Sequence, residues 1–274
     1  MTNSAFADMS GDNGNKLREQ AANGSANALT KIREAAKAGD VVAEFEFGAL
    51  YDYGQGVPQD YVQAAEWYRK AADRGSASAQ TNLGTLYNNG QGVLQDYAQA
   101  AVWWRKAVKH GDAEAQTNLG ILYKHGRGVP QDYAQAAVWW HKAADQGVAE
   151  AQTYLGTLYA YGQGVLQDYA QAAVWWRKAA DQGYAKAQYN LGFLYANGLG
   201  VPQDYSQAAV WWRKAADQGY AKAQYNLGVL YNNGQGVPQD YSQTAVWWRK
   251  AADQGIAEAQ QDLEILYSKG RGIP

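Results

Sequence analysis

The chain has 274 residues, a formal net charge of −2 and no cysteine. This charge gives no basic field that would draw the chain to nucleic acid or to an anionic membrane. Without cysteine there is neither a disulfide framework nor a thiolate metal site. No stretch approaches the roughly 18 apolar residues that predict a transmembrane helix, so membrane insertion is not expected.

Residues 1–24 are small, polar and rich in glycine and asparagine. Such a segment buries too little apolar surface to order itself, so it is predicted to be a disordered tail. Within it, Ala5-Phe6-Ala7 resembles the end of a secretory signal, although no charged or apolar segment precedes it. The alternatives are a chance match and a chain trimmed near an export signal. The compartment stays open, and the tripeptide favours a periplasmic or secreted location over a cytoplasmic one.

One sequence of 36 residues recurs along most of the chain, and its copies begin at Ala43, Ala79, Ala115, Ala151, Ala187, Ala223 and, for a last half copy, Ala259. A fixed period of this size predicts a solenoid, in which each repeat buries its apolar face by stacking on its neighbours. Residues 26–39 align with the second half of the first repeat and are predicted to form a degenerate cap. The predicted domain is a solenoid over residues 25–274.

Each repeat is predicted to contain two antiparallel helices, here named helix A and helix B. In the second repeat they are expected over about residues 77–89 and 97–110. Gly90 is expected to end helix A in the left-handed conformation, and Asp96 is expected to cap helix B. Gly84 recurs inside helix A although a glycine there costs about 1 kcal/mol relative to alanine. Its recurrence predicts a close approach of the paired helix.

The aromatic pair of helix B is predicted to pack in the core. A helical wheel places Trp104 at the centre of the apolar stripe and Trp103 on its flank. We therefore expect the second residue of each pair to be the more buried. Carbohydrate or proline stacking is the alternative role for these rings, and core packing is favoured by their position on the stripe.

The shared pattern A-x-x-x-L-G-x-x-Y-x-x-G-x-G-V-x-x-D-Y-x-x-A-x-x-W-[WY]-x-x-A-A-x-x-G resembles the Sel1-like repeat over about residues 26–274. That repeat is a relative of the tetratricopeptide repeat with a longer internal turn. The resemblance implies an all-α fold, a right-handed α/α superhelical solenoid with helix A lining the concave face. Proteins of this family look like adaptors in signalling, secretion or host contact, and they are common in bacteria.

The residues do not predict catalysis. The three histidines, His110, His125 and His141, do not converge, so no metal site is expected. The repeated aspartates are explained as helix caps, and no catalytic residue or cofactor is predicted. Arginines and lysines on helix B could track a phosphate backbone, but in five repeats an aspartate lies four residues after the arginine position and can pair with it across one turn wherever that arginine is kept. Neither an enzyme nor a nucleic-acid partner is expected.

Outward positions on helix A vary between repeats and are free to encode a partner, which is expected to be a protein or an extended peptide segment. The predicted binding residues are Tyr189, Phe193, Tyr225, Val229, Asn190, Asn226 and Lys124. The resemblance suggests that the asparagines clamp a peptide backbone, and the alternative is that they bond between neighbouring helices.

A structural role is the alternative function, with copies of the chain associating through their ends or their aromatic face. The last helix A, expected over residues 257–268, has no helix B after it, so Leu263 and Leu266 lack a partner within the same repeat. We expect this half-repeat to mediate homo-oligomer formation, or the native chain to continue past Pro274.

Overall fold

The computed structural model describes residues 12–272, and these form fifteen α-helices, one short 3₁₀ helix and no strand. The elements are α1 (Asp12–Ala22), α2 (Ala26–Lys37), α3 (Val41–Tyr53), α4 (Tyr61–Asp73), α5 (Ala77–Asn89), α6 (Tyr97–Ala107), η1 (Val108–His110), α7 (Ala113–His125), α8 (Tyr133–Asp145), α9 (Ala149–Tyr161), α10 (Tyr169–Asp181), α11 (Ala185–Asn197), α12 (Tyr205–Asp217), α13 (Ala221–Asn233), α14 (Tyr241–Asp253) and α15 (Ala257–Ser268). Within the described residues, the predicted all-α solenoid is confirmed.

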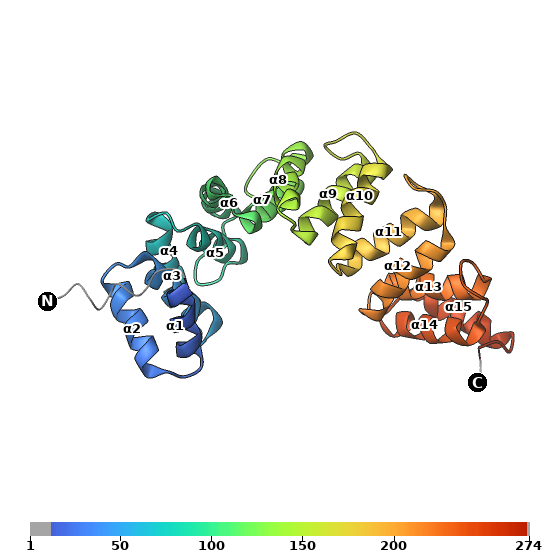
Figure 1. Cartoon of the computed structure of the whole chain (residues 1–274), viewed down its shortest axis with the longest axis horizontal. Helices are drawn as coiled ribbons and strands as arrows, with labels where there is room; N and C mark the ends of the chain where they lie inside the picture. The colour runs from blue at the N-terminus through green and yellow to red at the C-terminus, as the bar shows by residue number, and fades with distance from the viewer. Residues whose placement is uncertain (1–11, 273–274) are drawn as a thin grey trace. The chain divides into compact units, whose positions relative to one another are not determined.

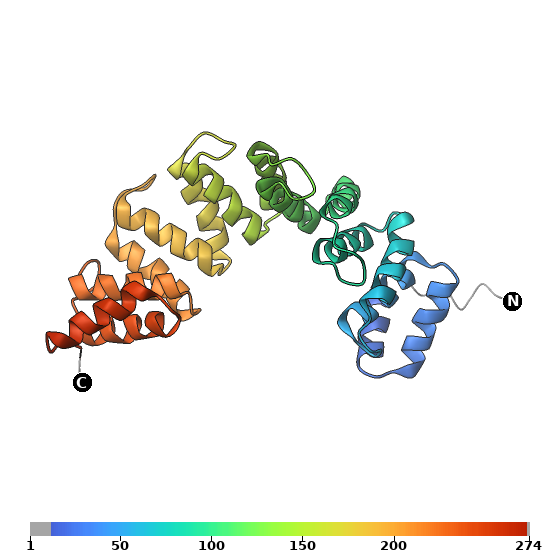
Figure 2. The ribbon, with the colours of Figure 1, turned by 180° about the vertical axis from the view of Figure 1, so that it is seen from behind.

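The chain divides into two compact units, residues 1–139 (unit 1) and residues 140–274 (unit 2), with the boundary inside α8. Within each unit, consecutive helices pack as pairs, for example α3 with α4 and α11 with α12 (Figure 1). Figure 2 shows the same ribbon from behind. Each odd-numbered helix from α3 to α13 is a helix A and is followed by its helix B, and α15 is a helix A with no further helix after it among the described residues. None of the described helices combines the length and the apolar character needed to span a bilayer.

The predicted caps hold each repeat to the same length. Gly90 has a φ of 70° and donates its N–H to the Leu86 carbonyl, which ends α5 in the left-handed conformation. Asp96 then accepts two backbone N–H bonds of 2.9 Å from the first turn of α6. Between them, Gln95 donates to the Asn88 carbonyl at 2.8 Å and closes the turn. The start of helix B is thereby fixed relative to the end of helix A.

The second glycine of this turn joins each repeat to the one before it. Gly92 has a φ of 68°, and a Cβ built on it would lie 2.1 Å from the Tyr61 carbonyl oxygen at the start of α4. Gly236 approaches the Tyr205 carbonyl in the same way, at 2.4 Å. Only a residue without a side chain allows backbone to rest on backbone this closely.

The glycine inside helix A faces the second aromatic residue of helix B, as predicted. A Cβ on Gly84 would lie 2.5 Å from the Trp104 Nε1 atom. The same indole nitrogen donates to the Thr81 carbonyl at 3.0 Å, one turn before the glycine. The close approach predicted from the recurring glycine is therefore confirmed. It brings the Trp104 indole within hydrogen-bonding distance of the helix A backbone.

The expectation that the second aromatic residue is the more buried is wrong for two of the pairs. Trp104 is 2% exposed against 4% for Trp103, but Trp212 is 5% exposed against 4% for Trp211, and Trp247 and Trp248 follow the same reversed order. The reason is that helix B lies between two repeats. Trp103 packs in the apolar cluster of the preceding repeat, where a wheel drawn for one repeat shows no partner.

The arginines of helix B also reach the neighbouring repeat. Arg105 donates to the Tyr123 hydroxyl at 3.0 Å, and the Arg213 guanidinium lies 5.4 Å from the ring centres of both Tyr231 and Trp247. At Arg213 this contact takes the place of the expected pairing with Asp217, whereas Arg105 has Lys109 four residues on. The structure records that pairing at His141 and Asp145 in α8, at 2.9 Å.

Five A helices, α5, α7, α9, α11 and α13, carry a buried glutamine at one position, and in α9, α11 and α13 it ties three segments together. Gln152 donates to the Ala144 carbonyl at 3.1 Å, and its own Oε1 accepts a bond of 2.9 Å from Gln182, which follows the next helix B. In the second repeat, His110 stands where Gln182 would be. The Oε1 atom of Gln80 is accordingly buried without a hydrogen-bond partner.

Part of the segment expected to be a disordered tail is a helix. Residues 12–22 form α1, in which Ala21 is only 1% exposed and Leu17 packs against the cluster of α2 and α3. Arg18 pairs with the buried Glu46 at 3.2 Å. The prediction failed because these residues gain their order from packing on α2 and α3. Residues 1–11, including Ala5-Phe6-Ala7, lie outside the described part of the chain.

Candidate binding groove

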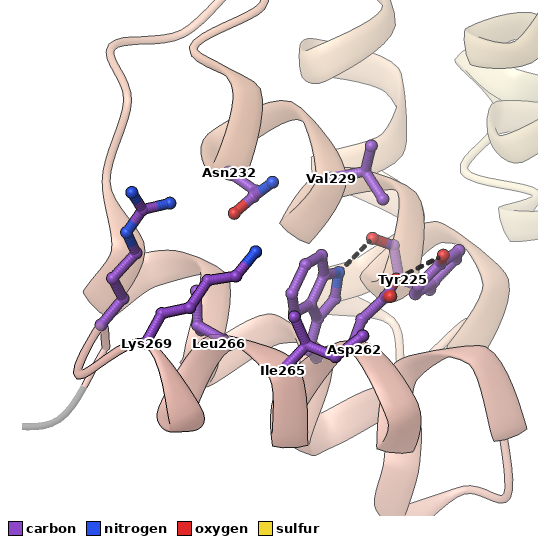
Figure 3. Close-up of a pocket in the computed structure, with 9 residues that line it drawn as sticks. Tyr225, Val229, Asn232, Asp262, Ile265, Leu266 and Lys269 are labelled. Atoms are coloured by element: carbon purple, nitrogen blue, oxygen red, sulfur yellow. Dashed lines mark hydrogen bonds between the residues drawn. The ribbon is translucent and has the colours of Figure 1, made fainter.

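A cavity of about 260 Å³ opens between α13, α14 and α15 in unit 2, and we call it the C-terminal groove (Figure 3). Its lining residues are Tyr225, Val229, Asn232, Trp248, Asp262, Ile265, Leu266, Lys269 and Arg271. The groove contains two of the residues predicted from the sequence to bind a partner, Tyr225 and Val229. Both come from helix A, as expected.

The floor of the C-terminal groove is held by hydrogen bonds. The Tyr225 hydroxyl donates to Asp262 at 2.8 Å, and Trp248 Nε1 donates to the Tyr225 carbonyl at 3.1 Å (Figure 3). The two rings stack with centroids 6.2 Å apart. Burial, followed by the bond to Asp262, raises the pKa of Tyr225 to about 12, so the phenol remains a donor at neutral pH. The floor is thus built from contacts within the chain itself.

The rim of the groove is apolar and cationic. The Ile265 side chain is 50% exposed, and Val229 is half-buried. Lys269 and Arg271 follow α15, and neither forms an ion pair with a described residue. Arg271 instead lies 4.7 Å from the ring centre of Tyr241. The groove therefore combines apolar surface with positive charge that has no carboxylate partner.

The other predicted aromatic residues lie on α11. Phe193 is 43% exposed, whereas Tyr189 is half-buried with its ring 5.1 Å from that of Tyr220. Burial raises the pKa of Tyr189, and the Asn226 side chain of α13 opposes that rise. The expectation that Tyr189 and Tyr225 need not serve repeat packing is wrong, because both rings pack against apolar clusters. Tyr189 lies against Tyr220, which directly precedes α13, while Tyr225 stacks on Trp248 of its own repeat and reaches α15 through its hydroxyl. Both roles predicted for Asn226, the clamp on a peptide backbone and the bond between helices, stay predictions.

The remaining predicted residues are divided between the units. Asn190 is half-buried on α11 in unit 2, and Lys124 lies near the end of α7 in unit 1. The structure thus groups six of the seven predicted residues in one unit. Of the described residues, no three His, Asp or Glu side chains are placed to hold a metal ion together.

A second groove, in unit 1, was not predicted from the sequence. This N-terminal groove has a volume of about 310 Å³ and is lined by Asp52, Tyr53, Gln59, Tyr61, Asn82, Thr85, Leu86, Gln91 and Glu114. Its residues come from three successive repeats, so no single repeat displays it. The available signal was that Asp52 is the one acidic residue at its position of the repeat, whereas Glu114 shares its residue type with Glu150 and Glu258.

Comparison with protein families defines the class of the chain. The model of the Sel1 repeat matches residues 41–76, 77–112, 113–148, 149–184, 185–220 and 221–256, and the chain belongs to the Sel1 repeat family. Each matched segment begins at the first residue of a helix A. Proteins with Sel1 repeats are commonly scaffolds for protein interaction. No curated protein matches the sequence.

Two solved bacterial structures are similar to this chain. The first is c5321, a protective antigen present in uropathogenic Escherichia coli strains, which displays an SLR fold. Its sequence is 40% identical and its TM-score is 0.85, and the match covers 88% of this chain and 52% of that one. The second is a Sel1 repeat protein from Oxalobacter formigenes, 36% identical with a TM-score of 0.74 over 96% of this chain and 78% of that one. The chain spans about half the length of the first.

Proposed function

We propose that this chain is a non-enzymatic scaffold that holds an extended segment of a partner protein on the helix A side of unit 2. The C-terminal groove is the observation that carries this proposal, because it joins a preformed aromatic floor to an open apolar rim. The family supports the same class of function. Positions shared by all repeats serve packing, so the positions that differ between repeats are the ones available for recognition.

The bound segment would place an apolar side chain against Val229 and Ile265, above the ring of Tyr225. Lys269 and Arg271 would meet a carboxylate on the same segment, since neither is paired with a described acid. Phe193 extends the apolar surface onto α11. Truncating an aromatic anchor of this kind costs about 2 kcal/mol of binding where the ring is covered by the partner.

A displayed library of random peptides, selected on the whole chain, supplies a defined probe for the test. The selected peptides are then measured against a double variant, Phe193→Ala with Ile265→Ala, which removes exposed side chains and spares the packed rings. We expect binding to weaken tenfold or more, equivalent to about 1.4 kcal/mol. Val246→Ala is the matched control, because Val246 is 44% exposed on helix B of the same unit and should leave affinity unchanged.

Two results would contradict the proposal. One is a set of selected peptides that bind the double variant as well as the unchanged chain. The other is self-association: the particle size in light scattering would grow with concentration, and Ile265→Ala would abolish that growth. The second result would assign the exposed side of α15 to contact between copies of the chain.

A further inference from the structure

The two grooves occupy the same place in the repeat and carry opposite charge. Five residues that line the N-terminal groove correspond, five repeats later, to five that line the C-terminal groove: Asp52, Asn82, Thr85, Leu86 and Gln91 to Asn232, Asp262, Ile265, Leu266 and Arg271. A cavity between successive A helices is therefore a product of the fold, and its lining differs. Two carboxylates, and no lysine or arginine, line the cavity in unit 1.

The two carboxylates of the N-terminal groove, Asp52 and Glu114, both exert their negative charge on the Tyr53 hydroxyl. The negative charges of Asp52 and Glu114 each raise the pKa of Tyr53, after the larger effect of its burial. Arg18 lowers that pKa and is itself engaged with Glu46. Neither Asp52 nor Glu114 forms an ion pair with a described residue. The region around the Tyr53 hydroxyl thus has a negative potential without a neutralising side chain in the groove.

Packing accounts for only part of this charge. Asp52 accepts a 3.0 Å hydrogen bond from the Tyr68 hydroxyl, which uses one of the several acceptor sites of a carboxylate. Later repeats have other residues at the position of Asp52, namely Asn88, Lys124, Ala160, Ala196 and Asn232. The solvent-accessible Glu114 follows the capping residue Asp112 and takes no part in the cap itself. A carboxylate is therefore not required by the fold at either position.

We propose that the N-terminal groove binds a positively charged side chain, arginine or lysine, of a partner peptide. The carboxylates of Asp52 and Glu114 accept its N–H groups, and such charge-assisted bonds are about twice as strong as neutral ones. The rings of Tyr53 and Tyr61 offer π faces to the same cation, with Tyr53 60% exposed. This site rests on the proposed scaffold function for its peptide, but it can be tested without that peptide.

The test uses the whole chain and a minimal probe, N-acetyl-arginine amide, followed by NMR. N-acetyl-citrulline amide is the neutral comparison, since it keeps the length and shape of the side chain and lacks the charge. We expect the arginine probe to shift resonances of α3, α5 and α7, to bind more weakly as salt is raised, and to outcompete the citrulline probe. N-acetyl-lysine amide should shift the same resonances.

Three variants complete the experiment. Glu114→Gln should weaken binding of the arginine probe about fivefold, the upper end for one ion pair at a protein surface. Asp52→Asn should do the same while keeping an acceptor for Tyr68, because asparagine stands at this position in two other repeats. Glu258→Gln removes an exposed glutamate four repeats after Glu114, outside the groove, and should change nothing.

Equal binding of the arginine and citrulline probes would overturn the proposal, as would unchanged affinity in both groove variants. Loss of binding in Glu258→Gln would show that the probe senses the general charge of the chain, and would overturn it as well. These readouts do not depend on Phe193 or Ile265. Failure here is thus distinguishable from failure of the proposed scaffold function, which is measured with selected peptides on unit 2.

Discussion

Replacing each indole of α12 by phenylalanine separates burial from hydrogen bonding. Trp211 and Trp212 are equally buried, at 4% and 5% exposed. Trp212 Nε1 donates to the Tyr189 carbonyl at 3.0 Å, whereas Trp211 Nε1 is buried without a hydrogen-bond partner. Both changes remove the same atoms and leave similar cavities, so the cavity contribution to the loss of stability should be nearly equal.

The difference between the two variants comes from the N–H group and the ring. Trp212→Phe removes a hydrogen bond worth about 1 kcal/mol, while Trp211→Phe relieves a buried unpaired donor that costs about 1–3 kcal/mol. Against this, Trp211 lies under Lys214 and Arg177, at 4.1 and 5.6 Å, and a smaller ring weakens that contact by about 0.5–1 kcal/mol. We expect Trp212→Phe to be more destabilising by about 1–3.5 kcal/mol.

Urea unfolding followed by circular dichroism measures this difference. Because repeats couple mainly to their neighbours, the curves should be fitted to a nearest-neighbour model and not to two states. Trp247 and Trp248 repeat the arrangement in α14, with Trp248 Nε1 bonded at 3.1 Å and Trp247 Nε1 unpaired, and serve as an independent pair. Equal losses in both pairs, or a larger loss at the first indole, would refute the reasoning.

Three further changes test other contacts. His110→Gln should give the buried Oε1 of Gln80 a donor and raise the free energy of unfolding by about 1 kcal/mol, and an unchanged urea midpoint would count against this. Gly156→Ala gains about 1 kcal/mol of helix propensity, but the added Cβ would lie 2.7 Å from the Trp176 ring. Overpacking of about 1–3 kcal/mol should therefore lower the urea midpoint. A higher midpoint would contradict the close approach. Burial raises the pKa of Glu46, and Arg18 opposes this only in part, so the folded state takes up the proton first as the pH falls. The contribution of Glu46 to stability therefore grows as the pH drops from its folded pKa towards 4.5. In urea melts across that pH window, the free energy of unfolding of Glu46→Gln should depend less on pH than that of the unchanged chain.

The parts of the fold that recur in every repeat were predictable. Gly84, Gly90 and Asp96 each perform one local task, and the sequence repeats that task at every period of 36 residues. Helix α1 was missed because it has no counterpart among the repeats. Its order comes from Ala21 and Leu17 packing on other helices, and the composition of a segment carries no information about such tertiary partners.

The candidate sites were predictable only in outline. A helical wheel places Tyr189 and Tyr225 opposite the buried stripe of helix A, but it cannot show that both rings pack against apolar clusters of the solenoid. The N-terminal groove was harder to predict because Asp52, Asn82 and Glu114 lie in three different repeats. Only the distances between repeats bring such residues together, and these distances are properties of stacking.

The contact of Gly92 with the Tyr61 carbonyl has a consequence for how such a chain can change over generations. This part of the join between repeats is made by backbone atoms, which are the same in every copy, and side chains such as Arg105 and Trp103 add to it. A repeat can be duplicated, deleted or exchanged in steps of 36 residues without creating a new kind of junction. Substitutions on the outer side of helix A leave that junction untouched. Copy number and recognition surface are therefore free to diverge independently, and gene duplication alone can lengthen the array.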